Sequence, residues 1–198
     1  MSTGRLVVGV TGASGAIYAQ RFLRQAAQNY QEIYLILSEQ AVQIANTELE
    51  VCLSKTKFET GPWLGADYPQ IKLLSDKNYF TPPASGSFRH DGMVIVPCSM
   101  GSAGRIANGI SDDLLTRSAD VCLKEKRPLI VVPREMPMNV IMLRNLTTLA
   151  EAGATVIPAA PAWYHKPATL EELADTVVAR ILQSLGIEQT LMRQWMAE

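Results

Sequence analysis

Two segments rich in glycine and serine contain the side chains best suited to hold a phosphorylated ligand. They are Gly12-Ala13-Ser14-Gly15 and Ser99-Met100-Gly101-Ser102. Glycine lets a backbone turn sharply with its N–H groups exposed, and a following helix adds partial positive charge. Such a turn binds anions, most often phosphate. Neither G-x-G-x-x-G nor G-K-[ST] is present, so the pattern predicts a phosphate site without specifying a nucleotide.

Other polar side chains directly follow apolar runs. Ser38 follows EIYLIL, Arg134-Glu135 follows LIVVP, and Trp163-Tyr164 comes soon after ATVIP. With the two glycine-rich segments, these positions supply hydroxyls, exposed N–H groups, a cation, an acid and aromatic rings. This combination suits a phosphorylated, planar ligand.

The elements that must position these residues are alternating strands and helices. Short apolar runs at 6–10, 32–37, 71–74, 93–96, 129–132 and 154–157 predict buried strands, and helical spacing of apolar residues lies between most of them. Strands separated by helices predict an α/β fold: a doubly wound, Rossmann- or flavodoxin-like three-layer sandwich with a mainly parallel sheet. Ligands of such sheets bind outside the carboxyl ends of the strands, where the strand order reverses.

Helix ends can also be placed from the sequence. Ser38 is expected to cap one helix, and Ser111 a longer one with Asp112 and Asp113 in its first turn. The apolar stripe of that longer helix includes Cys122, which we expect to be an inert core thiol. Thr169-x-x-Glu172 is a capping-box pattern, and Gly186 ends the last helix. We expect one domain over 1–186 and a C-terminal tail over 187–198.

Composition excludes several classes of protein. The 198 residues are 47% apolar and 19% charged with a net charge of −1, which argues against a nucleic-acid binder. Three dispersed cysteines and two histidines predict neither disulfides nor a metal site. The N-terminal apolar run is too short to span a membrane. We expect a soluble, cytoplasmic protein.

Four longer stretches carry a family resemblance: VTGASGAIYAQRFL (10–23), TPPASGSFR (81–89), VPCSMGSAGRIANGISDDLLTRSADVCLKEKRPLIVVPRE (96–135) and PAAPAWYHKP (158–167). The chain resembles the flavin prenyltransferase family of the UbiX/Pad type, within the flavodoxin-like, flavin-dependent cysteine decarboxylase superfamily. The resemblance implies an enzyme that joins the dimethylallyl group of dimethylallyl phosphate to N5 and C6 of reduced FMN without a metal. The product would serve a UbiD-type decarboxylase.

The same resemblance implies roles for individual residues. FMN would be held by Gly12, Ala13, Ser14, Ser38, Ser99, Met100, Gly101, Ser102 and Arg134. Groups near the reacting flavin or the donor phosphate would be Ser14, Glu48, Glu135, Lys124 and Arg117. The donor would also contact Tyr79, Tyr164, Arg180 and Trp195. Family members form homo-oligomers, so a homododecamer with sites at subunit junctions is expected.

Each of these charged or aromatic residues also has a purely structural interpretation. Arg117 and Lys124 would be a solvated helix face, and Arg180 the surface of an amphipathic helix. Glu48 would only end its helix, Glu135 would pair with Arg134, and Trp195 would pack on a neighbouring subunit.

One segment departs from the family pattern and leaves two other functions open. Met138-Asn139-x-x-Met142 is similar to the P-x-M-N-x-x-M segment of phosphopantothenoylcysteine decarboxylases, which use a histidine base ahead of the central strand. His90 precedes the corresponding run here. An FMN-dependent oxidative decarboxylase is therefore one alternative, and a non-catalytic FMN-binding protein is another. The choice between a mono- and a diphosphate donor also stays open.

Overall fold

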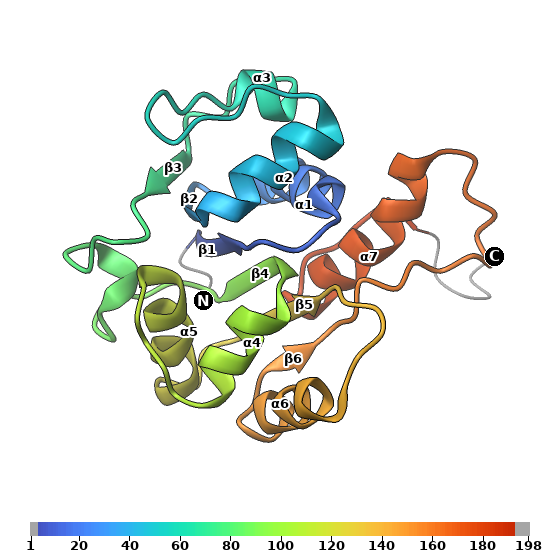
Figure 1. Cartoon of the computed structure of the whole chain (residues 1–198). Helices are drawn as coiled ribbons and strands as arrows, with labels where there is room; N and C mark the ends of the chain where they lie inside the picture. The colour runs from blue at the N-terminus through green and yellow to red at the C-terminus, as the bar shows by residue number, and fades with distance from the viewer. Residues whose placement is uncertain (1–3, 193–198) are drawn as a thin grey trace.

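The computed structural model describes residues 4–192 and places a six-stranded sheet at the centre of the chain (Figure 1). The strands are β1 (Arg5–Val10), β2 (Glu32–Leu37), β3 (Ile71–Leu74), β4 (Met93–Cys98), β5 (Leu129–Pro133) and β6 (Thr155–Val156). They are ordered β3-β2-β1-β4-β5-β6, and every pair is parallel. The predicted doubly wound, parallel fold is confirmed.

The helices and helical turns between these strands follow the predicted alternation. They are α1 (Ala16–Asn29), α2 (Glu39–Leu49), α3 (Gly61–Leu64), the 3-10 turn η1 (Pro82–Ala84), α4 (Met100–Ala107), α5 (Leu114–Lys124), α6 (Val140–Glu151) and α7 (Leu170–Ser184). None of the helices within residues 4–192 combines the length and apolar character needed to cross a membrane.

Two apolar layers bury the sheet on both faces. Alternate residues of the strands point to opposite faces, so Val8 packs with α1 and α7 while Val7 packs with α4 and α5. The strands are nearly continuous apolar runs because neither face meets water. The result is the expected three-layer sandwich, with the carboxyl ends of the strands free to form a site.

Some predicted boundaries were wrong. Ser111 does not cap α5: the cap is Asp113, whose carboxylate accepts from the Thr116 backbone N–H at 2.7 Å while the Thr116 hydroxyl accepts from the Asp113 N–H at 3.2 Å. This reciprocal pair satisfies two groups at once, which the Ser111 hydroxyl alone would not do. The strand predicted at 154–157 shortens to β6, and that at 93–96 extends to Cys98.

One of the two hydrogen bonds of the predicted capping box is present at the start of α7. The Thr169 hydroxyl accepts from the Glu172 backbone N–H at 3.1 Å, which confirms Thr169 as the cap. The Glu172 carboxylate, however, accepts from the N–H of Ala168 at 2.7 Å.

The aromatic residues of the irregular stretch between β2 and β4 differ in exposure. Trp63, which we expected to be poorly buried in a single chain, is only 1% exposed because α3 packs it against α1. Phe80 and Tyr79 remain 100% and 41% exposed, as predicted. They belong to the loop between β3 and η1.

Candidate functional site

The two glycine- and serine-rich bends lie side by side because β1 and β4 are neighbours. Strand order reverses between these two strands, since the chain passes from β1 to β2 on one side and returns to β4 on the other. Thr11 joins the bends: its hydroxyl donates to the carbonyl of Pro97 at 3.1 Å and accepts from the N–H of Ser99 at 2.7 Å. A ligand reaching this point meets both bends together.

Two glycines in the first bend have steric reasons to be glycine. A Cβ at Gly12 would lie 2.6 Å from the Cβ of Gln40 on α2. Gly15 has a φ of 104°, and a Cβ there would lie 2.8 Å from the Tyr18 ring. The missing side chain at Gly12 lets α2 approach the bend closely, and the left-handed backbone at Gly15 lets α1 begin directly after it.

A carboxylate of the chain itself stands at the start of α1. Glu48, near the end of α2, accepts from the backbone N–H groups of Gly15 and Ala16, both at 2.8 Å. These two N–H groups belong to the donors at the N-terminus of α1 that have no partner within the helix. The sequence predicts an anion at this position. Glu48 therefore does more than end its own helix, because it connects α2 to the first bend.

The electrostatics of this corner favour the ionised carboxylate. Burial raises the pKa of Glu48, but bonds from the Ser14 hydroxyl and the Ala16 and Gly15 N–H groups outweigh it, and the charge of Arg134 adds to them. The pKa of Glu48 is lowered as a result. The structure thus brings Ser14, Glu48 and Arg134 into one electrostatic neighbourhood, as the predicted site requires.

The serines at the ends of β2 and β4 have their positions fixed by helix capping. Ser38 caps α2, its hydroxyl oxygen accepting from the Ala41 N–H at 3.1 Å, and Ser99 caps α4 by accepting from the Ser102 N–H at 3.3 Å. Among residues 4–192, no atom lies within 4 Å of where a Cβ at Gly101 would be, so this part of the bend is open. Hydroxyls, N–H groups and an open glycine fit a flavin phosphate and its polar ring edge.

Arg134 and Glu135 line a cleft beside the second bend. The cleft, of about 380 Å³, is bounded by Pro133–Met136, Met138 and 158–160. The Arg134 N–H donates to the carbonyl of Cys98 at 3.2 Å, which fixes the β5 turn against the end of β4. The Glu135 carboxylate accepts from the Met136 N–H at 3.1 Å. Arg134 is exposed and Glu135 half-buried, so both are accessible to a ligand.

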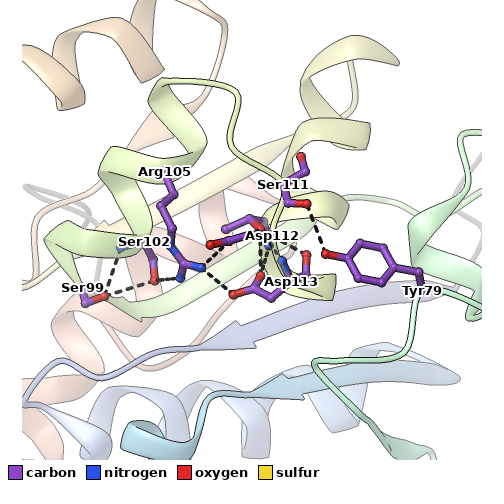
Figure 2. Close-up of polar contacts among 8 residues, drawn as sticks. Tyr79, Ser99, Ser102, Arg105, Ser111, Asp112 and Asp113 are labelled. Atoms are coloured by element: carbon purple, nitrogen blue, oxygen red, sulfur yellow. Dashed lines mark hydrogen bonds and ion pairs between the residues drawn. The ribbon is translucent and has the colours of Figure 1, made fainter.

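Arg105 is a site residue that the sequence did not reveal (Figure 2). Its guanidinium donates to the carboxylates of Asp112 and Asp113 at 2.6 and 2.8 Å, and to the Ser102 hydroxyl at 3.3 Å. The available signal was the Ser102–Arg105 spacing of three residues, which places both on one helix face. The two aspartates come from a separate connection, and no spacing rule identifies them as partners.

Tyr79 reaches the same neighbourhood from its exposed loop. Its hydroxyl donates to the carbonyl of Ser111 at 3.1 Å (Figure 2). Ser111 thus contributes a backbone acceptor, in place of the predicted cap. Lys55 holds the base of the loop by pairing with Asp76 at 2.9 Å and with Glu39 at 2.7 Å.

Arg117 and Lys124 lie on α5 and do not meet the two bends within one chain. Arg117 donates to the carbonyl of Ala84 at 3.1 Å and pairs with Asp120 at 2.9 Å. Lys124, the last residue of α5, has its nitrogen 3.5 Å from Glu125. Because a helix rises ~1.5 Å per residue, Lys124 lies ~15 Å along the axis from the start of α5.

Arg180 and Tyr164 are also exposed in the single chain. Arg180 donates to Gln183 at 2.7 Å on the outer side of α7. The Tyr164 ring is 52% exposed and packs on His165 with centroids 4.1 Å apart. Trp195 lies outside the described residues. One chain therefore places Glu135 and Tyr79 near the predicted FMN residues and leaves the other predicted donor residues of the described chain on its surface: Arg117, Lys124, Tyr164 and Arg180.

Two groups relevant to other chemistries are held in the core. His90 is buried ahead of β4, at the amino edge of the sheet and opposite the bends, where its Nδ1 lies 3.0 Å from the carbonyl of Gly92. Burial, helped by Arg127, lowers the pKa of His90 despite the Gly92 carbonyl. Burial also raises the pKa of the Cys98 and Cys122 thiols to about 12, and the predicted core position of Cys122 is confirmed.

Comparisons with known proteins agree with this geometry. The Flavoprotein family model matches residues 1–186. A flavin prenyltransferase UbiX of Pseudomonas aeruginosa is 42% identical over 195 residues, covering 96% of this chain and 93% of the relative. A flavin prenyltransferase UbiX of Methanocaldococcus jannaschii is 41% identical over 191 residues, covering 96% and 98%.

Solved structures give the same result. AnUbiX (PadA1), determined with FMN and dimethylallyl pyrophosphate, superposes with a TM-score of 0.84 at 34% identity, over 98% of both chains. A dodecameric FMN-dependent UbiX-like decarboxylase of Escherichia coli O157:H7 gives 0.85 at 36% identity, over 98% of this chain and 100% of that one. A phosphopantothenoylcysteine decarboxylase shares the fold alone, at 21% identity and a TM-score of 0.55. The chain belongs to the flavin prenyltransferases of the UbiX type, within the Flavoprotein family.

Proposed function

We propose that the protein transfers a dimethylallyl group from dimethylallyl phosphate to N5 and C6 of reduced FMN and supplies the product to a UbiD-type decarboxylase. The observation that supports this most directly is the meeting of both bends with Glu48 and Arg134 where the strand order reverses. Reduced FMN supplies the nucleophilic ring atoms, and the side chains of this chain bind, orient and balance charge.

The residues for FMN fall into two groups by their chemistry. Backbone N–H groups and hydroxyls come from Gly12, Ala13, Ser14, Ser38, Ser99, Met100, Gly101 and Ser102. Arg134 adds the cation, and arginine's planar fork suits phosphate oxygens in pairs. Neutral donors around the ring and one cation for the phosphate match the charge distribution of FMN. The residue types and their convergence therefore fit this cofactor.

The donor site needs a second copy of the chain. Arg117, Lys124 and Arg180 are exposed or half-exposed and lie apart from the bends within one chain. A leaving phosphate needs charge that is stabilised more strongly in the transition state than in the bound donor. We infer that neighbouring copies bring these cations, together with Tyr164, to the FMN of another subunit.

The function can be tested directly by product mass. Anaerobic incubation with reduced FMN and dimethylallyl phosphate is expected to add one C5 unit to the flavin, measured by mass spectrometry. A parallel incubation with the diphosphate distinguishes the two donors. Bound FMN that stays unmodified with both donors would contradict prenyl transfer and leave a non-catalytic FMN-binding protein.

An exposed apolar surface on α6 allows the predicted oligomer to be tested separately from prenyl transfer. Val140, Ile141 and Leu143 are 60%, 69% and 50% exposed, and Met136 just before them is 84% exposed. Exposed apolar side chains in one patch indicate an interface. Ile141→Asp is expected to reduce the native mass seen by sedimentation, because a buried unpaired carboxylate destabilises the contact. Gln28→Asp, at an exposed position of α1 on the other face of the sheet, is the control, and an unchanged mass for Ile141→Asp would place the interface elsewhere.

A further inference from the structure

We propose that Arg105 is a positioning residue that directs the Ser102 hydroxyl proton toward bound FMN. This inference rests on the proposed function, because it requires FMN at the second bend. It concerns a side chain whose link to the flavin would run through Ser102, and Figure 2 shows Arg105 in contact with that serine.

The hydroxyl of Ser102 has a limited capacity for hydrogen bonds. A hydroxyl has one proton to donate and two lone pairs to accept with. The Ser99 hydroxyl donates to the Ser102 oxygen at 3.1 Å, and Arg105 donates to it at 3.3 Å. Both lone pairs are then used. The proton is the one part of this hydroxyl left to act, and it points away from both donors.

Burial makes the direction of that proton matter. Ser102 is 4% exposed, and no acceptor for its proton is found among residues 4–192. A buried donor without an acceptor costs free energy, so this proton favours a ligand that supplies one. FMN offers ring carbonyl and phosphate oxygens as such acceptors.

Arg105 is itself held in one place. Its Nη1 donates to both Asp112 and Asp113, and Asp113 also caps α5 through Thr116. Burial lowers the pKa of Arg105, but the bonds to Asp113 and Asp112 outweigh it and raise the pKa, so the guanidinium remains a donor. Because its planar fork meets three acceptors at once, it cannot turn away from Ser102 without losing another bond.

A purely structural role is the competing explanation. Arg105 also ties α4 to the connection before α5, and losing that tie would loosen the site generally. The two explanations differ in one measurable respect. Positioning acts through the Ser102 hydroxyl and disappears when that hydroxyl is absent, whereas general loosening does not depend on it.

A double-mutant cycle on FMN binding separates the two. The dissociation constant of FMN is measured by quenching of flavin fluorescence as the apoprotein is added, with no turnover involved. Arg105→Met keeps the aliphatic stem and removes the donors, and we expect it to weaken FMN binding roughly 3- to 10-fold, the range for a lost hydrogen bond. In the Ser102→Ala background, the same change is expected to have less than about a twofold effect.

The cycle needs one control variant far from the bends and one reserve variant at position 105. Arg5→Ala removes an arginine that is ion-paired with Glu32 at the amino end of β1, the end opposite the bends, and should leave FMN binding unchanged. Arg105→Lys keeps the charge beside both aspartates but has no planar fork to reach Ser102 at the same time, so it carries the cycle if Arg105→Met does not fold. An equal loss of FMN affinity in the wild-type and Ser102→Ala backgrounds, or no loss in either, would overturn the role of Arg105 but not the proposed function. A wild-type protein that binds no FMN would overturn the proposed function, and this inference with it.

Discussion

Replacing Glu48 by Gln is expected to leave FMN bound and to slow prenyl transfer by roughly 100-fold, a typical effect of removing one preorganised electrostatic group. The carboxylate is held by the N–H groups of Gly15 and Ala16, so its negative charge has a fixed position beside the first bend. Positive charge that develops on the allyl carbon or the flavin would be stabilised there. Glutamine keeps an acceptor for the N–H groups but loses the charge.

The readouts are FMN retention and single-turnover rates of prenyl transfer. Glu151→Gln, an exposed glutamate at the last position of α6, is the matched control and should leave both unchanged. Normal turnover in Glu48→Gln would limit Glu48 to connecting α2 with α1.

The same variant has a predictable pH dependence of stability. The pKa of Glu48 is lowered in the folded state, so its contribution is present above its ordinary pKa of 4.5 and is lost as pH falls through the lowered value. Urea midpoints of the wild type and Glu48→Gln should therefore differ at neutral pH and converge in acid. A difference that stays constant with pH would mean that the ionised carboxylate does not support the fold.

Much of the fold could be predicted because burial on both faces leaves a clear pattern. The strands at Glu32–Leu37 and Ile71–Leu74 have the predicted limits, since each is a short apolar run between polar turns. Helix caps were harder to assign. Ser111, Asp112 and Asp113 can all cap a helix, and only the reciprocal bond with Thr116 decides for Asp113.

The features that the sequence predicted wrongly or missed depend on contacts between distant elements. Trp63 lies in an irregular stretch, and its burial comes from packing against α1 rather than from local spacing. Arg105 has one partner on its own helix and two on a separate connection, so the sequence hides the cluster. The two bends predicted to hold FMN lie together because topology alone brings the carboxyl ends of β1 and β4 side by side.

Arg134→Ala is expected to lose FMN affinity, whereas Lys124→Ala is expected to lose donor binding and turnover. Arg134 lies beside the first bend, where its charge acts on Glu48 and Tyr18, so its loss should weaken FMN binding more than tenfold, as expected for a lost charge-assisted bond. Lys124 is half-exposed and its nitrogen is 3.5 Å from Glu125, a surface contact that adds little stability. Its loss should raise the KM of the donor and lower kcat with FMN affinity unchanged.

Paired titrations of FMN and of dimethylallyl phosphate measure both effects. Lys57→Ala, which removes an exposed lysine from the loop after α2, is the control for loss of a surface cation. Equal loss of both affinities in the two variants would show that the cations are divided wrongly between cofactor and donor.

Mixing the two variants tests whether the site is shared between copies. Within one chain Lys124 sits at the far end of α5 from the bends, so a complete site would take Arg134 from one copy and Lys124 from another. Random co-assembly of Arg134→Ala and Lys124→Ala chains then gives about one site in four with both natural side chains. Activity should rise to about that fraction of the wild type after dissociation and reassembly. If each chain formed its own site, the mixture would be no more active than the average of the two variants.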